Sequence, residues 1–390
     1  MPSKIQEKSQ YKSSEALKSL PKEFISYAGI GACQIKLPSQ LSLSNSLNEI
    51  LVFARSVNAT DVHLSPGTPI VFRKYTELSP QTEELLTDKR IEEIVSEGFP
   101  KETVGQFVES GDLEFVHVIE GAGRFRVTLM KQRYGVDITV RVIPLSISSF
   151  ESLGLPASCK HLTKWSQGLV LVTGPAGCGK SATLSTLIDL VNEERYDHII
   201  TIEQPIEMIY TSKKCQITQR EIHSHTLSQA NALRAALRED PDIIVINELR
   251  DLESVQLAVT AAETGHLVFG TMNTTDAAQT IANLIDSFPA DDQGTIANMI
   301  SESLRGIICQ QLIPTANKTG VVPAYEVLMV NSAVSSMIRE RKITQITNTI
   351  SMGKSFGMVL FDNSLQDLLS KGMISVEEAR KRAINPQTFQ

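Results

Sequence analysis

The sequence predicts an α/β fold in two parts: a small α+β domain, then a larger domain built on a buried parallel sheet. Three observations lead to this prediction. The chain has 390 residues, more than one hydrophobic core usually serves. Short segments of the first half alternate apolar and polar residues, as half-buried antiparallel strands do. In the second half, near-continuous β-branched runs alternate with helix-length segments, which is typical of parallel strands buried on both faces.

Composition and charge narrow the class of protein. Hydrophobic residues make up 42% of the chain and charged residues 21%, as in ordinary globular proteins. The net charge of −7 argues against a nucleic-acid partner, because such binders are usually basic. Five cysteines without a CxxC pair predict neither a disulfide framework nor a zinc ribbon. No apolar stretch approaches the roughly 18 residues of a membrane span, and the polar N-terminus does not resemble a signal peptide, so we expect a cytoplasmic protein.

The first half divides into an extension and a domain. Residues 1–45 carry five lysines within the first 22 positions and no sustained apolar period, so we expect a poorly ordered extension. Residues 46–148 are expected to form the α+β domain, with helices over Leu47–Val57 and near Asp88–Glu97. The Ser/Pro-rich stretch Pro144–Ser152 is the expected linker. The predicted strands are Asp61–Leu64, Leu113–Val116, Arg124–Val127 and Ile138–Val142.

Residues 149–390 are expected to form the second domain. Asp240-Pro241 interrupts a helix before the third apolar run, and Gly265 ends a helix before the fourth. From Asp292 onward helical periodicity dominates, so we expect the chain to end in helices packed by apolar stripes. The four apolar runs of the predicted parallel sheet are Leu169–Thr173, Ile199–Ile202, Ile243–Ile246 and Leu267–Thr271.

A phosphate-binding motif follows the first of these runs. Gly174–Ser181 fits the pattern GxxxxGK[ST], between a strand that ends at Thr173 and a predicted helix over Ala182–Val191. Glycines let backbone N–H groups turn toward phosphates, and a helix N-terminus favours their negative charge. Lys180 is expected to reach the β- and γ-phosphates, and the Ser181 hydroxyl to bind Mg²⁺.

The motif predicts a nucleoside triphosphate and Mg²⁺ as ligands, against the alternative of a glycine-rich connection that binds nothing. Cys178 has no candidate base nearby in the sequence, so we interpret it as a small loop residue rather than a nucleophile. The predicted nucleotide-binding residues of the loop are Gly174, Pro175, Ala176, Gly177, Cys178, Gly179, Lys180, Ser181 and Ala182.

Polar residues follow the other three runs: Glu203 the second, Asn247 and Glu248 the third, and Thr271 and Asn273 the fourth. Ligands of open parallel sheets bind outside the carboxyl ends of the strands. Phosphoryl transfer to water needs Mg²⁺ to neutralise developing charge and a carboxylate or amide that positions the attacking water. Glu248 stands where a Walker-B acid belongs and is expected to act on Mg²⁺ through water, while Glu203 is expected to orient the attacking water. For each, the alternative is a structural salt-bridge partner.

His266 opens the fourth run, directly after Gly265. Two interpretations stand side by side: a sensor of the γ-phosphate, or a half-buried histidine with satisfied hydrogen bonds.

Several segments resemble one family closely. From about Leu47 to Phe389 the chain is similar to the type IV pilus retraction ATPases, the PilT family of the secretion-ATPase superfamily. Ala333–Glu340 resembles the C-terminal motif of the retraction branch. The segments that carry the resemblance most specifically are Ala59–Ser65, Ala235–Ile244, Ala261–Thr271 and Phe288–Ala290.

The resemblance implies a PAS-like N-terminal domain, a RecA-like ATPase domain and a homohexameric ring. It implies that ATP lies between the two domains and that arginine fingers reach the phosphates; Arg124, Arg126 and Arg141 fall in the matching strands. For each of these arginines, the alternative is an exposed strand residue. Hydrolysis would then drive pilus retraction against a platform protein at the inner membrane, where the ring would be peripheral. A second related ATPase in the ring is left open.

The chain also departs from the family. Gln204 replaces an aspartate of the acidic segment, Asn247 a glycine before the Walker-B acid, and Asn273 a histidine. Losing a charge-assisted partner costs about 1.5–3 kcal/mol, so slow hydrolysis is one hypothesis. Three functions stay open: a retraction motor, an ATP-binding accessory ring subunit with weak hydrolysis, and a pilus-assembly or type II secretion ATPase. The third usually carries a tetracysteine zinc element, which is not seen in this sequence.

Overall fold

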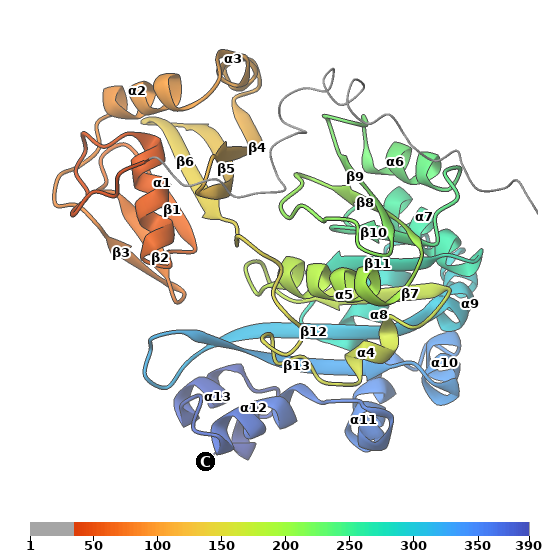
Figure 1. The fold of residues 1–390 in the computed structure, drawn as a ribbon. Coiled ribbons are helices and arrows are strands. Elements are labelled where there is room, and N and C mark those ends of the chain that lie inside the picture. Colours follow the sequence, from red (N-terminus) through yellow and green to blue (C-terminus); the bar gives the residue numbers. More distant parts are fainter. Residues whose placement is uncertain (1–34, 390) are drawn as a thin grey trace, which may run out of the picture.

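The computed structural model describes residues 35–389, which form two sheets joined by an irregular segment (Figure 1). Most of the predicted extension, residues 1–34, lies outside the described residues. Its last part packs on the core of the first half, because Leu41 is buried there and the carbonyl of Leu43 accepts a hydrogen bond from Arg90 of the following helix Asp88–Gly98 at 2.7 Å. The domain boundaries 46–148 and 149–390 stay a prediction, and each sheet falls within one of the two ranges.

The first sheet is antiparallel, with the strand order β3-β2-β1-β6-β5-β4. Both predicted helices and all four predicted strands are confirmed here. The β2–β3 hairpin and helix α3 were not predicted. The elements are α1 (Leu47–Ser56), β1 (Asp61–Leu64), β2 (Val71–Lys74), β3 (Glu77–Pro80), α2 (Asp88–Gly98), α3 (Lys101–Ser110), β4 (Asp112–Ile119), β5 (Gly123–Gln132) and β6 (Gly135–Val142).

The second sheet has the order β13-β12-β7-β11-β10-β8-β9, and only the pair β12–β13 is antiparallel. The four predicted apolar runs are its strands β7, β8, β10 and β11. The strands are β7 (Gly168–Thr173), β8 (His198–Glu203), β9 (Gln216–Glu221), β10 (Ile243–Ile246), β11 (Leu267–Met272), β12 (Leu304–Pro314) and β13 (Val321–Met329).

Helices cover both faces of this sheet, which explains its unbroken apolar runs. Leu169 and Leu171 join the core under α6–α9, whereas Val170 and Val172 join the core under α4 and α5. Alternate residues of one strand therefore face two different cores. The helices are α4 (Cys159–Leu162), α5 (Lys180–Glu194), α6 (Gln229–Ala236), α7 (Leu252–Glu263), α8 (Ala277–Asp286) and α9 (Gln293–Ser303).

The expectation that helical periodicity dominates from Asp292 onward missed two strands, β12 and β13. After α9 the chain forms β12, which pairs with β7 on one side and with β13 on the other. Because β12 is buried on both faces, its sequence lacks the alternation that marks a strand. Its two glutamines, Gln310 and Gln311, also break the apolar run. A central strand was therefore mistaken for part of a helical segment.

Of the C-terminal helices at the bottom of Figure 1, α12 packs against β13, whereas α10 packs against α9 and α11 against α8. Val334, Ile338 and Leu365 are buried, as the predicted apolar stripes require. The elements are α10 (Ser332–Arg339), α11 (Ile346–Met352), α12 (Phe361–Ser370) and α13 (Val376–Arg382), with single 3₁₀ turns at Ile343–Gln345, Gly353–Phe356 and Pro386–Thr388.

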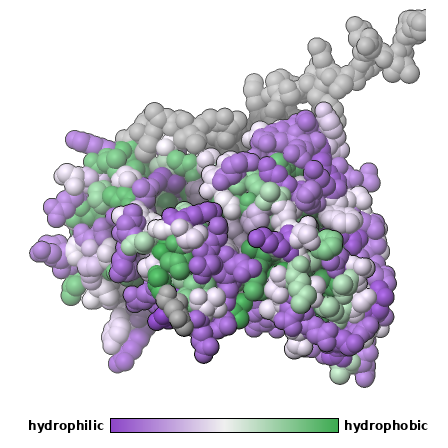
Figure 2. Space-filling view, turned by 90° about the horizontal axis from the view of Figure 1, so that it is seen from below, coloured by the Kyte–Doolittle hydropathy of each residue, from purple (hydrophilic) through white to green (hydrophobic). Residues whose placement is uncertain are grey.

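The surface seen in Figure 2 carries separate hydrophobic areas among hydrophilic side chains. Among residues 35–389, no helix is long and apolar enough to cross a membrane.

Glu326 on β13 is a buried carboxyl whose ionisation opposes folding. Burial and the nearby charges of Asp276 and Asp362 raise its pKa, the hydrogen bond from the Ala277 N–H at 2.9 Å lowers it, and together these effects bring the pKa to about 7. Between pH 4.5 and 7 the native state holds a proton that the unfolded chain releases, so stability falls as the pH rises. We expect Glu326→Gln, whose oxygen still accepts the Ala277 bond, to stabilise the protein by about 2 kcal/mol at pH 8.

Thermal unfolding of both proteins at pH 8 and pH 5 checks this expectation. The gain should largely vanish at pH 5, where native Glu326 is neutral. An equal gain at both pH values would contradict a cause that depends on charge.

Candidate nucleotide site

The predicted phosphate loop joins a buried strand to a helix, as its motif requires. β7 ends at Thr173 and α5 begins at Lys180. Gly174, Gly177 and Gly179 all have positive φ, at 147°, 76° and 92°. A Cβ on Gly174 would lie only 2.3 Å from the carbonyl oxygen of Gln310, so glycine is required there for space as well as for conformation.

Gln310 supports the phosphate loop through hydrogen bonds of its side chain. The sequence did not indicate this residue. Its side chain is buried, donates to the carbonyl of Cys178 at 2.6 Å and accepts from the Thr183 hydroxyl at 2.6 Å. It lies on β12, the strand that was missed. Cys178 is itself buried, and burial raises the pKa of its thiol. The cysteine is therefore a poor nucleophile, in line with its interpretation as a small loop residue.

The ammonium of Lys180 is held by three oxygen acceptors. It donates to the carbonyls of Gly174 and Pro175 at 2.7 and 3.1 Å, and to the side-chain oxygen of Asn273 at 2.7 Å. Burial lowers its pKa, partly offset by the charge of Glu248. A nucleotide phosphate would have to replace one or more of these acceptors.

Strand register places the polar strand ends at one edge. Ile246 of β10 pairs with Ile202 of β8, and Met272 of β11 pairs with Thr173 of β7. The residues that follow these strands therefore meet beside the phosphate loop. This edge is where ligands of open parallel sheets bind.

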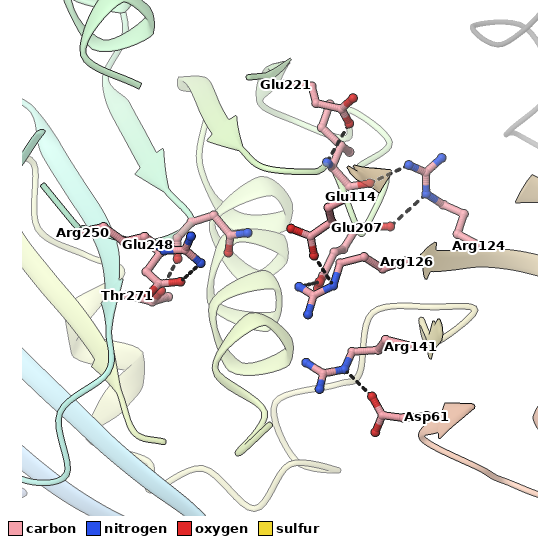
Figure 3. A network of polar contacts seen from close by, with 12 residues as sticks. Asp61, Glu114, Arg124, Arg126, Arg141, Glu207, Glu221, Glu248, Arg250 and Thr271 are labelled. Carbon is pink, nitrogen blue, oxygen red and sulfur yellow. Dashed lines mark hydrogen bonds and ion pairs between the residues drawn. The ribbon is translucent and has the colours of Figure 1, made fainter. Parts of the chain in front are cut away.

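The amide of Asn273 bridges the two main charges of this edge. Its nitrogen donates to Oε1 of Glu248 at 2.5 Å, while its oxygen accepts from Lys180. An ammonium can only donate and a carboxylate can only accept, so the orientation of the amide follows from chemistry. The other carboxylate oxygen of Glu248 accepts from Arg250 at 2.7 Å (Figure 3).

Glu203 is buried at the end of β8. It accepts hydrogen bonds from Thr201 at 2.6 Å and from Gln219 at 2.9 Å. Burial raises its pKa, the two hydrogen bonds lower it and the charges of Glu207 and Glu221 raise it, and together these effects bring the pKa to about 7.

Glu203 lines a cavity of about 20 Å³ together with Ser181, Asn247 and Glu207. A cavity of that size holds roughly one water molecule. Among the predicted site residues, the structure thus brings together the loop 174–182, Glu203 and Glu248. An acid beside the loop serine, with space for a water, supplies one of the elements that hydrolysis of a phosphoanhydride needs, a group that can position the attacking water.

His266 does not reach this edge, which corrects the expectation of a γ-phosphate sensor. It precedes β11, whose six residues place the amino end roughly 16 Å from the carboxyl end. Its ring bonds to the carbonyl of Ala261 at 3.1 Å. The error arose because residues at both ends of a strand look alike in sequence, although only the carboxyl end faces the loop. The second interpretation, a partly buried histidine with a satisfied bond, describes it.

The three predicted arginine fingers lie at different places (Figure 3). Arg124 and Arg126 contact residues 206–207, which follow β8. Arg141 is bonded to Asp61 at 3.0 Å, and its guanidinium lies 4.0 Å from the position that a Cβ on Gly177 would occupy. Its charge also contributes, after burial, to the lowered pKa of Lys180. Of the three, Arg141 is the one beside the phosphate loop.

The donor set fits a Mg²⁺ ion that is held mainly by nucleotide phosphates. Within residues 35–389 there is no group of three or more His, Cys, Asp or Glu side chains arranged to hold a metal. Mg²⁺ at nucleotide sites usually binds one or two protein oxygens and keeps several waters. Ser181 and, through water, Glu248 can supply that part.

Comparison with known proteins decides the family. The profile of the family described as type II/IV secretion system protein matches residues 110–355. The chain belongs to this family. It is 42% identical over 343 residues to the type IV pilus retraction ATPase PilT of Pseudomonas aeruginosa, which spans 88% of this chain and 99% of the relative. A twitching motility protein of Neisseria gonorrhoeae is 46% identical over 278 residues, or 71% of this chain and 74% of the relative.

Solved structures agree with the sequence comparison. The crystal structure of the pilus retraction motor PilT with bound ADP superposes with a TM-score of 0.77 at 37% identity, over 88% of this chain and 99% of that chain. The predicted fold class, a RecA-like core with a smaller N-terminal α+β domain, is confirmed. The resemblance drawn from motifs is confirmed as well.

Proposed function

We propose that this protein is the hexameric ATPase that couples ATP hydrolysis to the retraction of type IV pili. One observation carries the proposal: a chain similar to PilT over nearly its whole length also has a complete phosphate loop with Glu203 and Glu248 at the same sheet edge. The similarity to a retraction motor crystallised with ADP supports nucleotide use.

The residues at the edge would divide the work as follows. Backbone N–H groups of the loop 174–179 and the N-terminus of α5 receive the phosphates, and Lys180 neutralises their charge. Ser181 and, through water, Glu248 hold Mg²⁺, which offsets the charge that develops on the phosphate oxygens. Glu203 accepts a hydrogen bond from the attacking water and orients it.

Arg141 would serve as the arginine finger, since it lies beside Gly177 and its planar fork suits phosphate oxygens. The predicted location, cytoplasmic and peripheral at the inner membrane against a platform protein, belongs to the same proposal, as does a second related ATPase in the ring. The net charge of −7 supports a function without nucleic acid.

Retraction can be tested in a piliated bacterium that lacks its own retraction ATPase. The wild-type protein should restore twitching, whereas Lys180→Ala should not. A stable, hexameric wild-type protein that leaves the cells piliated and immobile would contradict retraction as the function.

Asn273 favours a second candidate, an accessory ring subunit that binds ATP and hydrolyses it slowly. Its amide hydrogen-bonds both Lys180 and Glu248, and because an amide does not titrate, this bridge persists at every pH. A histidine at this position can gain a proton, which would place a second cation beside Lys180 and free the lysine from the bridge. We expect Asn273→His to raise kcat about tenfold if the bridge limits the rate. Asn273→Ala, which removes the bridge alone, is the control.

Phosphate release from both variants decides between the candidates. A wild-type rate that neither substitution increases would exclude attenuation by Asn273. Nothing in residues 35–389 favours the assembly or type II secretion alternative.

A further inference from the structure

Two arginines of the first sheet hold the segment after β8 by hydrogen bonds. We call residues Glu203–Glu207 the acidic segment. Arg124 of β5 donates to the carbonyls of Glu207 and Ile206 at 3.0 and 2.5 Å, and Arg126 of the same strand binds the Glu207 carboxylate at 2.7 Å (Figure 3). Three hydrogen bonds therefore cross from the first sheet to the second at this one point.

The ion pair between Arg126 and Glu207 is shielded from water. The two side chains are only 26% and 13% exposed. Water and salt weaken such a pair less than an open surface pair, so removing one partner has a larger effect. Glu114 fixes Arg126 from its own sheet, with an oxygen 3.1 Å from the guanidinium Nε (Figure 3).

The second sheet holds the same segment from the other side. The N–H of Ile206 donates to Glu221 of β9 at 2.9 Å. Glu207 also lines the cavity that contains Glu203 and Ser181. Any displacement of β5 relative to β8 must therefore either break these hydrogen bonds or move Glu207, which lines the cavity.

We propose that Arg126 is a positioning residue: through its ion pair with Glu207 it makes the geometry beside Ser181 and Glu203 depend on where the first sheet lies. The inference rests on the proposed ATPase function. It differs from the expectation of an arginine finger, because Arg126 then acts through a carboxylate of its own chain and not on a phosphate. Arg124 supports it by holding the backbone of the same segment.

A double-mutant cycle separates the two roles. Arg126→Gln and Glu207→Gln each remove one end of the pair, and the double variant removes both. Glu93→Gln, a carboxylate-to-amide change on α2 away from the second sheet, is the matched control. Each single change should lower kcat about tenfold with KM changed less than about threefold, which corresponds to one charge-assisted hydrogen bond. The double variant should be no slower than the slower single variant.

A second readout does not depend on catalysis. Hydrogen–deuterium exchange of the peptide that covers residues 204–210 should become faster in both single variants and stay unchanged in Glu93→Gln. If the wild-type protein has no ATPase activity, the proposed function fails. Hydrogen–deuterium exchange then still tests whether the Arg126–Glu207 ion pair holds the acidic segment in place.

Two results would overturn the inference. If Arg126→Gln weakens binding of a fluorescent ADP or ATP analogue while Glu207→Gln leaves it intact, Arg126 is a phosphate ligand. If the effects of the single variants on kcat multiply in the double variant, the two residues act independently.

Discussion

Replacing Lys180 by alanine is expected to weaken nucleotide binding by about 100-fold and to abolish measurable hydrolysis. The ammonium would make charge-assisted hydrogen bonds to two phosphates, each worth about 1.5–3 kcal/mol, and tenfold in affinity corresponds to about 1.4 kcal/mol. Its present acceptors are loop carbonyls and Asn273, so the folded protein should tolerate the loss. Titration with a fluorescent, non-hydrolysable ATP analogue measures the effect.

Lys371→Ala is the matched control, because this exposed lysine pairs with Asp367 on a C-terminal helix. It should bind the analogue like the wild-type protein. An Lys180→Ala variant that keeps its circular dichroism spectrum and binds with wild-type affinity would contradict the placement of the phosphates on this loop.

Replacing Glu203 by glutamine is expected to lower kcat by about 100- to 1,000-fold while nucleotide affinity stays within threefold. The amide oxygen can still accept the bonds from Thr201 and Gln219, so the local structure should persist. It cannot carry the negative charge that orients and activates the water. Single-turnover hydrolysis alongside analogue binding separates the two effects.

The raised pKa of Glu203 also predicts the direction in which kcat changes with pH. Burial raises the pKa of Glu203 from 4.5 to about 7, so below pH 7 the carboxyl is largely protonated and inactive. The wild-type kcat should rise with pH through about 7 and then level off, while the residual rate of Glu203→Gln should lack this step. A wild-type profile that is flat between pH 5.5 and 8.5, or a fully active Glu203→Gln, would remove Glu203 from the mechanism.

Features of the site that are local in sequence were predictable. The phosphate loop is defined by eight consecutive residues between a strand and a helix. Glu203 directly follows one apolar run, and Glu248 follows another after Asn247. A parallel sheet brings such strand ends together whichever order its strands take. The prediction failed for His266, because this residue precedes its strand and therefore lies at the amino end, away from the phosphate loop.

Features that depend on distant pairing were not predictable. Gln310 supports the loop from β12, a strand whose burial on both faces hides its period. Asn273 bonds to Lys180, which lies 93 residues away along the chain, and its role follows only from the parallel register of β7 and β11. Arg126 forms an ion pair with Glu207, which follows a strand of the other sheet, so its partner depends on how the two sheets pack.

Steady-state phosphate release from Mg-ATP, by purified wild-type protein beside Lys180→Ala, tests the central claim most directly. The proposed function predicts that the wild-type hexamer releases phosphate at a rate that saturates with ATP, and that Lys180→Ala stays at background. A hexameric wild-type protein whose rate does not exceed that of Lys180→Ala would contradict the assignment of this site as an ATPase.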